Sequence, residues 1–159
     1  MPLSSAEYAM LAAFRYNLRR FLAFSEQAAE GVGLTQQQYQ ALLVVRAHPG
    51  PGLITITGLA REMLIRHHSA VGMVDRLEEL GMLRRVPSPD DRRKVGLRLT
   101  ASGLHVFDKL ASIHRTELRS IGRDVGRLMA WFAGEAGDGA TAPAARRVRS
   151  ANRGARARS

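Results

Sequence analysis

The chain has 159 residues, of which 45% are hydrophobic, so it is long enough to form one compact domain with a real core. Twenty-four Lys and Arg against fourteen Asp and Glu give a formal net charge of +10. This excess favours a polyanionic partner, either nucleic acid or an anionic membrane surface. Cysteine is absent, which excludes disulfides, thiolate metal sites and thiol redox chemistry.

Two helices are predicted in the first third of the chain. Apolar residues recur with helical spacing over about 5–30, before a glycine-containing stretch that ends the helix. Thr35 and Gln38 match a capping box, which predicts a second helix that continues to about Ala47. Turn residues at 48–52 stop it.

A short helix, a turn and a longer helix are expected next. Residues 53–55 are expected to form a short strand, after which Thr57 caps a short helix that ends at about Met63. A further helix spans about His67–Leu80, with Gly81 as its C-terminal stop. The apolar residues expected to be buried on one face of this helix are Ala70, Met73, Val74, Leu77 and Leu80.

The apolar period then changes from 3.6 to 2, which indicates two strands at 83–86 and 95–100. The charged segment 87–94 between them is too long for a tight turn and is predicted to be a projecting loop. A helix followed by a turn, a second amphipathic helix and a basic ribbon matches a winged helix-turn-helix.

A long last helix follows the ribbon. Thr100 or Ser102 can cap it, and helical spacing of apolar residues continues to Phe132. Gly122 and Gly126 are weak points at which the helix is expected to kink or divide.

The predicted fold is therefore mainly α with a small β-ribbon, a winged helix-turn-helix between long N- and C-terminal helices. We expect a DNA-binding domain over 1–133 with its winged-helix core at about 34–103. Residues 134–159 are rich in Gly, Ala, Ser and Arg, so they are expected to be a disordered tail. The tail is either a solvated end or an electrostatic arm on phosphates.

Two clusters of residues are candidates for DNA contact. A recognition helix enters the major groove with its N-terminal end, and serine, histidine and arginine side chains can bond base edges there, while glycine permits close approach. The alternative for each of these residues is that it belongs to a solvated polar face and contacts no DNA. The candidates on this helix are Arg66, His67, His68, Ser69, Gly72 and Arg76.

The second cluster lies in the loop. Arg92, Arg93 and Lys94 form a cationic tip suited to the narrow, negative minor groove. Asp91 beside them is expected to orient Arg93 through a carboxylate–guanidinium pair. The alternative for the loop is an ordinary charged turn.

Several motifs resemble the MarR family of bacterial regulators. The resemblance covers about Leu34 to His114, and its most specific parts are the Asp-Arg-Arg of the loop followed by Leu-Thr-x-x-Gly. The matching segments are Thr57-Gly-Leu-Ala-Arg-Glu-Met-Leu, Arg66-His-His-Ser-Ala-Val, Val74-Asp-Arg-Leu-Glu-Glu-Leu-Gly-Met-Leu-Arg-Arg, Asp90-Asp-Arg-Arg-Lys-Val and Leu99-Thr-Ala-Ser-Gly.

The resemblance implies a homodimer, joined by its first and last helices, that represses transcription from a pseudo-palindromic operator in double-stranded DNA. It also implies that Asp91 and Arg93 are the wing pair, and that Ser69 and its neighbours lie in the major groove. The last helical region is shorter than usual for the family. Members often bind a small aromatic or phenolic effector, for which Phe14, Phe21 and Tyr39 are either the pocket or plain core.

The sequence contains no nucleophile–base pair, phosphate-binding loop or paired carboxylates, so we expect no enzymatic activity. Adjacent helical residues rarely share one ion, so His67 and His68 are not expected to bind a metal. No cofactor and no membrane association are expected, and the cytoplasm is the expected location. The alternatives are a non-specific architectural DNA-binding protein, a ligand-binding or enzymatic winged-helix protein, and a protein-interaction module.

Overall fold

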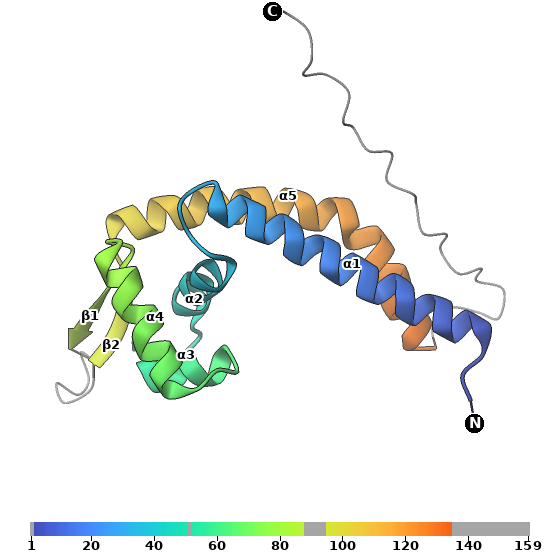
Figure 1. The fold of residues 1–159 in the computed structure, drawn as a ribbon, viewed down its shortest axis with the longest axis horizontal. Helices are drawn as coiled ribbons and strands as arrows, with labels where there is room; N and C mark the ends of the chain where they lie inside the picture. Colours follow the sequence, from blue (N-terminus) through green and yellow to red (C-terminus); the bar gives the residue numbers. More distant parts are fainter. Residues whose placement is uncertain (1, 51, 88–94, 135–159) are drawn as a thin grey trace, which may run out of the picture. The chain divides into compact units, whose positions relative to one another are not determined.

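The computed structural model describes residues 2–50, 52–87 and 95–134. The predicted loop tip at 88–94 and the predicted tail from 135 onward lie outside these residues. The described elements are α1 (Ser5–Glu30), α2 (Gln36–Ala47), α3 (Ile56–Glu62), α4 (His67–Glu79), β1 (Leu83–Pro87), β2 (Val95–Leu99) and α5 (Ala101–Phe132) (Figure 1). The predicted fold class, mainly α with one small antiparallel ribbon, is confirmed.

The chain divides into two compact units. One covers residues 19–121 and holds α2, α3, α4 and both strands, together with the end of α1 and the first two thirds of α5. The described part of the other consists of residues 2–18 and 122–134. Within the described residues, no helix combines the length and the apolar character that a membrane crossing would require.

Threonine side chains begin three of the helices in unit 19–121. The capping box predicted for α2 is confirmed, because the Gln38 amide donates to Thr35 Oγ1 and the Gln38 side chain accepts from the Thr35 amide. Thr100 caps α5 by accepting from the Gly103 amide at 2.9 Å. The prediction for α3 is wrong, since Thr55 and not Thr57 is its N-cap.

The connection before α3 explains this difference. The backbone amide of Leu97 in β2 donates to the carbonyl of Ile54 at 2.8 Å, and Thr55 forms an isolated β-bridge with Gly96. The expected strand at 53–55 is thus reduced to a bridge against the outer edge of β2. Because this bridge holds Ile54 and Thr55 extended, the helix begins directly after Thr55.

Two glycines occupy positions that disfavour a larger residue, one because of its backbone conformation and one because of a close contact. Gly81 follows α4 with a positive φ of 68°, while Met82 donates to the Leu77 carbonyl and Gly81 donates to the Glu78 carbonyl. This Schellman arrangement confirms Gly81 as the helix stop. A Cβ on Gly103 would lie 1.8 Å from the Met82 carbonyl oxygen, which explains the glycine of the Leu-Thr-x-x-Gly motif.

The core of unit 19–121 lies between α2, α4, the ribbon and the N-terminal half of α5. Its largest fully buried side chains include Leu42, Leu59, Leu77, Leu97 and Leu110. Four of the five residues predicted as the buried stripe of α4 are buried. Leu80 is the exception: it is the C-cap residue of α4 and is 45% exposed.

The second unit pairs the beginning of α1 with the end of α5. Met10 and Leu128 are buried there, and the Phe14 ring meets the Phe132 ring edge-on at a centroid distance of 6.4 Å. Of the two outcomes considered for Gly122 and Gly126, a kink or a division, the division does not occur, since α5 is continuous through both. Each glycine costs a helix about 1 kcal/mol, which the packing of a long helix can offset.

Candidate nucleic-acid interface

Helix α4 presents a polar face to the outside. Ala70, Met73, Val74 and Leu77 are buried on its opposite side, which fixes the rotation of the helix. Six residues at this helix were predicted to contact DNA. Gly72 is partly buried, and the other five are exposed: Arg66, His67, His68, Ser69 and Arg76. The structure therefore leaves accessible five residues that were predicted from the polar face of the helix and from its N-terminal end.

Two basic residues lie at the N-terminal end of α4, Arg66 and His67. Arg66 is the N-cap residue in an extended conformation, and its side chain makes no capping hydrogen bond. His67 approaches the preceding helix, since its Nδ1 lies 3.5 Å from Thr57 Oγ1. This contact joins the first turn of α3 to the first turn of α4.

Gly72 provides a flat place in the middle of this face. A Cβ built there would meet only the far end of the Arg76 side chain, at 3.8 Å. Its φ is not in the left-handed region. The fold itself therefore does not require glycine at this position, and the missing side chain would permit close approach of another molecule.

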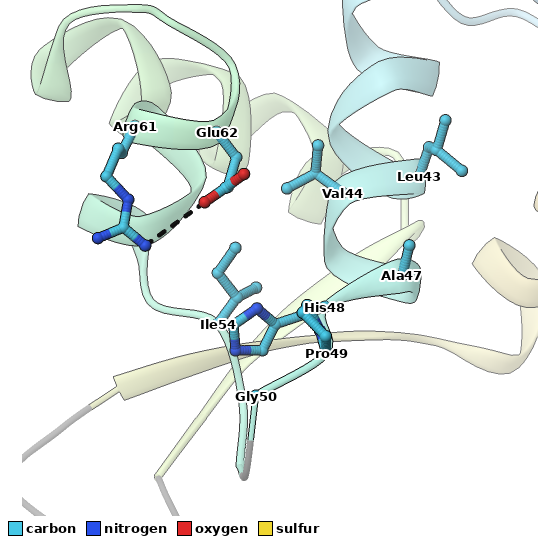
Figure 2. Close-up of a pocket in the computed structure, with 9 residues that line it drawn as sticks. All are labelled: Leu43, Val44, Ala47, His48, Pro49, Gly50, Ile54, Arg61 and Glu62. Atoms are coloured by element: carbon cyan, nitrogen blue, oxygen red, sulfur yellow. Dashed lines mark hydrogen bonds and ion pairs between the residues drawn. The ribbon is translucent and has the colours of Figure 1, made fainter.

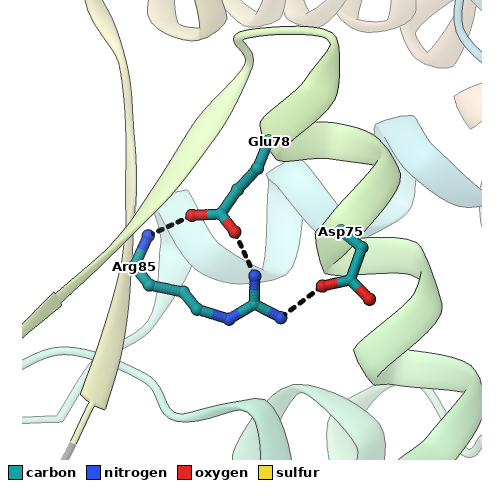
Figure 3. Close-up of polar contacts among 3 residues, drawn as sticks. All are labelled: Asp75, Glu78 and Arg85. Atoms are coloured by element: carbon teal, nitrogen blue, oxygen red, sulfur yellow. Dashed lines mark hydrogen bonds and ion pairs between the residues drawn. The ribbon is translucent and has the colours of Figure 1, made fainter.

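A charge network that the sequence analysis missed joins α4 to β1 (Figure 3). The Arg85 guanidinium donates to Glu78 Oε2 and, at 2.7 Å, to Asp75 Oδ1, while the Arg85 backbone amide donates to Glu78 Oε1 at 2.7 Å. Burial lowers the pKa of Arg85, but hydrogen bonds and the charges of Asp75 and Glu78 outweigh it and raise that pKa above its ordinary value.

This network has two consequences for the interface. It fixes β1 relative to α4 through charge-assisted hydrogen bonds. Its single positive charge also offsets one of the two negative charges that Asp75 and Glu78 place on α4. The signal available in the sequence was the spacing of Asp75 and Glu78, three residues apart on one helical face, followed by an arginine at an inward position of the strand.

The second predicted cluster lies outside the described residues. Asp91, Arg92, Arg93 and Lys94 belong to the segment between the end of β1 at Pro87 and the start of β2 at Val95. The strands that carry this segment are paired in register from Leu83↔Leu99 to Pro87↔Val95.

The aromatic residues considered for an effector are packed against other rings. Tyr39 stacks on His114 at a centroid distance of 4.4 Å, and Phe21 meets the same imidazole edge-on. Leu110 accepts a hydrogen bond from His114 Nδ1 at 2.8 Å, and Ser25 Oγ lies 2.9 Å from its Nε2. Burial raises the pKa of Tyr39. This arrangement favours a core role for Phe21 and Tyr39, and Phe14 packs on Phe132 in the other unit.

A separate cavity of about 350 Å³ lies between the end of α2 and α3 (Figure 2). Its apolar wall comes from the last turns of α2 and from Ile54, and Arg61 and Glu62 face this wall from α3. The lining residues are Leu43, Val44, Ala47, His48, Pro49, Gly50, Ile54, Arg61 and Glu62. Within the described residues, no three His, Asp or Glu side chains are grouped to hold a metal ion.

Comparison with known proteins finds similarity to one family of regulators. Residues 32–94 match the model of the MarR family. The transcriptional regulator PecS of Dickeya dadantii is 28% identical over 88 residues, covering 55% of this chain and 53% of PecS. The transcriptional activatory protein BadR of Rhodopseudomonas palustris is 32% identical over 85 residues, covering 54% of this chain and 49% of BadR. The chain thus spans about half the length of these relatives.

Solved structures share the fold at lower identity. AbsC of Streptomyces coelicolor is 22% identical with a TM-score of 0.64, covering 79% of this chain and 84% of AbsC. MepR of Staphylococcus aureus in a DNA complex is 18% identical with a TM-score of 0.59, covering 76% and 92%. CouR of Rhodococcus jostii bound to p-coumaroyl-CoA is 21% identical with a TM-score of 0.57, covering 72% and 84%.

Proposed function

We propose that this chain, a member of the MarR family through residues 32–94, is a sequence-specific regulator of transcription that binds double-stranded DNA as a homodimer. The observation that carries the proposal is the exposed polar face of α4, which begins at Arg66 and is held beside the ribbon by Arg85. The similarity to the transcriptional regulators PecS and BadR supports the proposal, as does the similarity in fold to MepR, which has been solved in complex with DNA. No catalytic role is proposed, and the cytoplasm is the proposed location.

In this proposal each α4 enters a major groove with its N-terminal end. Ser69 and the two histidines bond base edges, Gly72 permits the approach, and Arg66 and Arg76 bond phosphate or guanine. Arg92, Arg93 and Lys94 reach the neighbouring minor groove, with Asp91 orienting Arg93. The two helices of a dimer then read a pseudo-palindromic operator whose half-sites lie about 10 base pairs apart.

The proposed dimer uses α1 and α5. Both helices carry large apolar side chains that remain exposed in the single chain, among them Leu11, Leu18, Leu22, Ile113, Leu118 and Met129. Each of the two units thus exposes large apolar side chains on its own part of α1 and α5, which is typical of a surface that another protein covers. We propose residues 1–133 as the part that binds DNA and dimerises, followed by the basic tail.

We further propose that the protein is a repressor and that a small aromatic or phenolic effector releases it from DNA. MepR in complex with ethidium bromide and CouR in complex with p-coumaroyl-CoA support a ligand of this type. The cavity beside α3 has a volume of about 350 Å³ and a mainly apolar lining with two charged side chains, which is at the lower end of the size range of small-ligand sites. A ligand there would act on α3 and, through the His67 contact, on the start of α4.

Selection of bound sequences from a random duplex library tests the proposal. We expect enrichment of a pseudo-palindrome with half-site centres about 10 base pairs apart, and a dimer in sedimentation measurements. Equal affinity for all duplexes would support the alternative of a non-specific architectural protein. A monomer without affinity for any duplex would refute both interpretations.

A further inference from the structure

The outer face of the ribbon carries two arginines directly opposite each other. Arg84 of β1 and Arg98 of β2 are cross-strand partners in the antiparallel pair. Both are exposed, whereas their neighbours Leu83, Leu97 and Leu99 are buried. Side chains alternate along a strand, so the two arginines point away from the face on which Arg85 binds Glu78.

Such a pairing is unfavourable in the isolated chain. Like charges at opposite positions of two strands repel each other instead of contributing a cross-strand attraction. Within the described residues, no carboxylate forms an ion pair with either arginine, and Asp75 and Glu78 of α4 pair with Arg85 instead. An anion between or beside the two guanidinium groups would remove this repulsion.

We propose that Arg84 and Arg98 form a phosphate-binding site for the backbone of duplex DNA, outside the residues expected to read bases. The inference rests on the proposed function. The pair lies three residues from the ribbon's loop end on each strand, which is about 10 Å at 3.3 Å per residue. A minor groove is only about 6 Å wide, so a loop that enters it brings the supporting strands close to the phosphates along its border.

Phosphate contacts position a protein but carry no sequence information. The arginine pair is therefore expected to increase affinity for every duplex equally. Arg85 is expected to assist indirectly, because its bonds to Asp75 and Glu78 hold the ribbon beside α4 (Figure 3).

The first test is the salt dependence of DNA binding. The double variant Arg84→Ala/Arg98→Ala should bind both a selected operator and random duplex more weakly by the same factor. The slope of log affinity against log salt should fall in magnitude by about 1–2, since two phosphate contacts are lost. The control is Arg115→Ala/Arg119→Ala on α5, which removes the same charge from exposed positions. Equal slopes for the two double variants would overturn the inference.

A charge reversal separates DNA binding from folding. Arg98→Glu places a carboxylate opposite Arg84, so thermal unfolding should occur at the same or a higher temperature, while affinity for any duplex should fall below that of Arg98→Ala. Unchanged affinity in Arg98→Glu would overturn the site and leave the proposed function intact. If the unmodified chain bound no duplex, the proposed function itself would fail.

Discussion

Replacement of Gly72 by alanine is expected to change stability and DNA affinity in opposite directions. Gly72 lies inside α4, with a φ outside the left-handed region, and a new Cβ would touch only the end of the Arg76 side chain at 3.8 Å. Alanine can therefore be accommodated without strain. Because glycine is about 0.5–1 kcal/mol less favourable than alanine in a helix, the free energy of unfolding should rise by about that amount.

The same methyl group would stand on the face proposed to approach DNA. If the base edges come as close as the missing side chain indicates, the helix must move outward, and operator binding should weaken by about 1–3 kcal/mol, which is about 5- to 150-fold. Urea unfolding followed by circular dichroism gives the change in stability. Titration of a fluorescent operator duplex at fixed salt gives the change in affinity.

Gly122→Ala is the matched control. Gly122 also lies inside a helix with open space around the position of a Cβ, so its replacement should raise stability similarly without adding a methyl group to the face of α4. A Gly72→Ala protein with higher stability and normal affinity would refute the proposed approach of α4 to DNA. Lower stability in this variant would refute the reading of the local geometry.

Three further changes test other parts of the structure. Leu64→Gly should raise the free energy of unfolding by about 0.5–1 kcal/mol, because Leu64 has a φ of 56° and is 92% exposed; a loss of stability in urea would contradict this. Arg85→Ala should lower that free energy by about 1–2 kcal/mol, since two partly exposed carboxylates lose their partner, and equal thermal unfolding temperatures would exclude a stabilising network. Arg93→Ala should weaken operator binding by about 1–3 kcal/mol, and unchanged affinity at physiological salt would remove the loop from the mechanism.

The residues that cap a helix could be predicted from the sequence wherever only one nearby residue was suited to that position. Thr35 with Gln38, and Gly81 after an apolar stripe, specify their caps through groups only a few residues apart. Thr55 and Thr57 are both good capping residues, and the sequence offers no local reason to prefer either. The bridge from Ile54 and Thr55 to β2 selects Thr55, and this contact joins residues about forty positions apart.

The sequence alone determined the order of the elements, the polar face of α4 and the candidate residues on it, because periodicity and charge are properties of neighbouring residues. The three-dimensional structure alone revealed the Arg85 network, the opposed pair Arg84 and Arg98, and the left-handed turn at Leu64. The register of the two strands and the packing of α4 against β1 decide these features. Both depend on contacts between separated segments, which no local pattern of residues encodes.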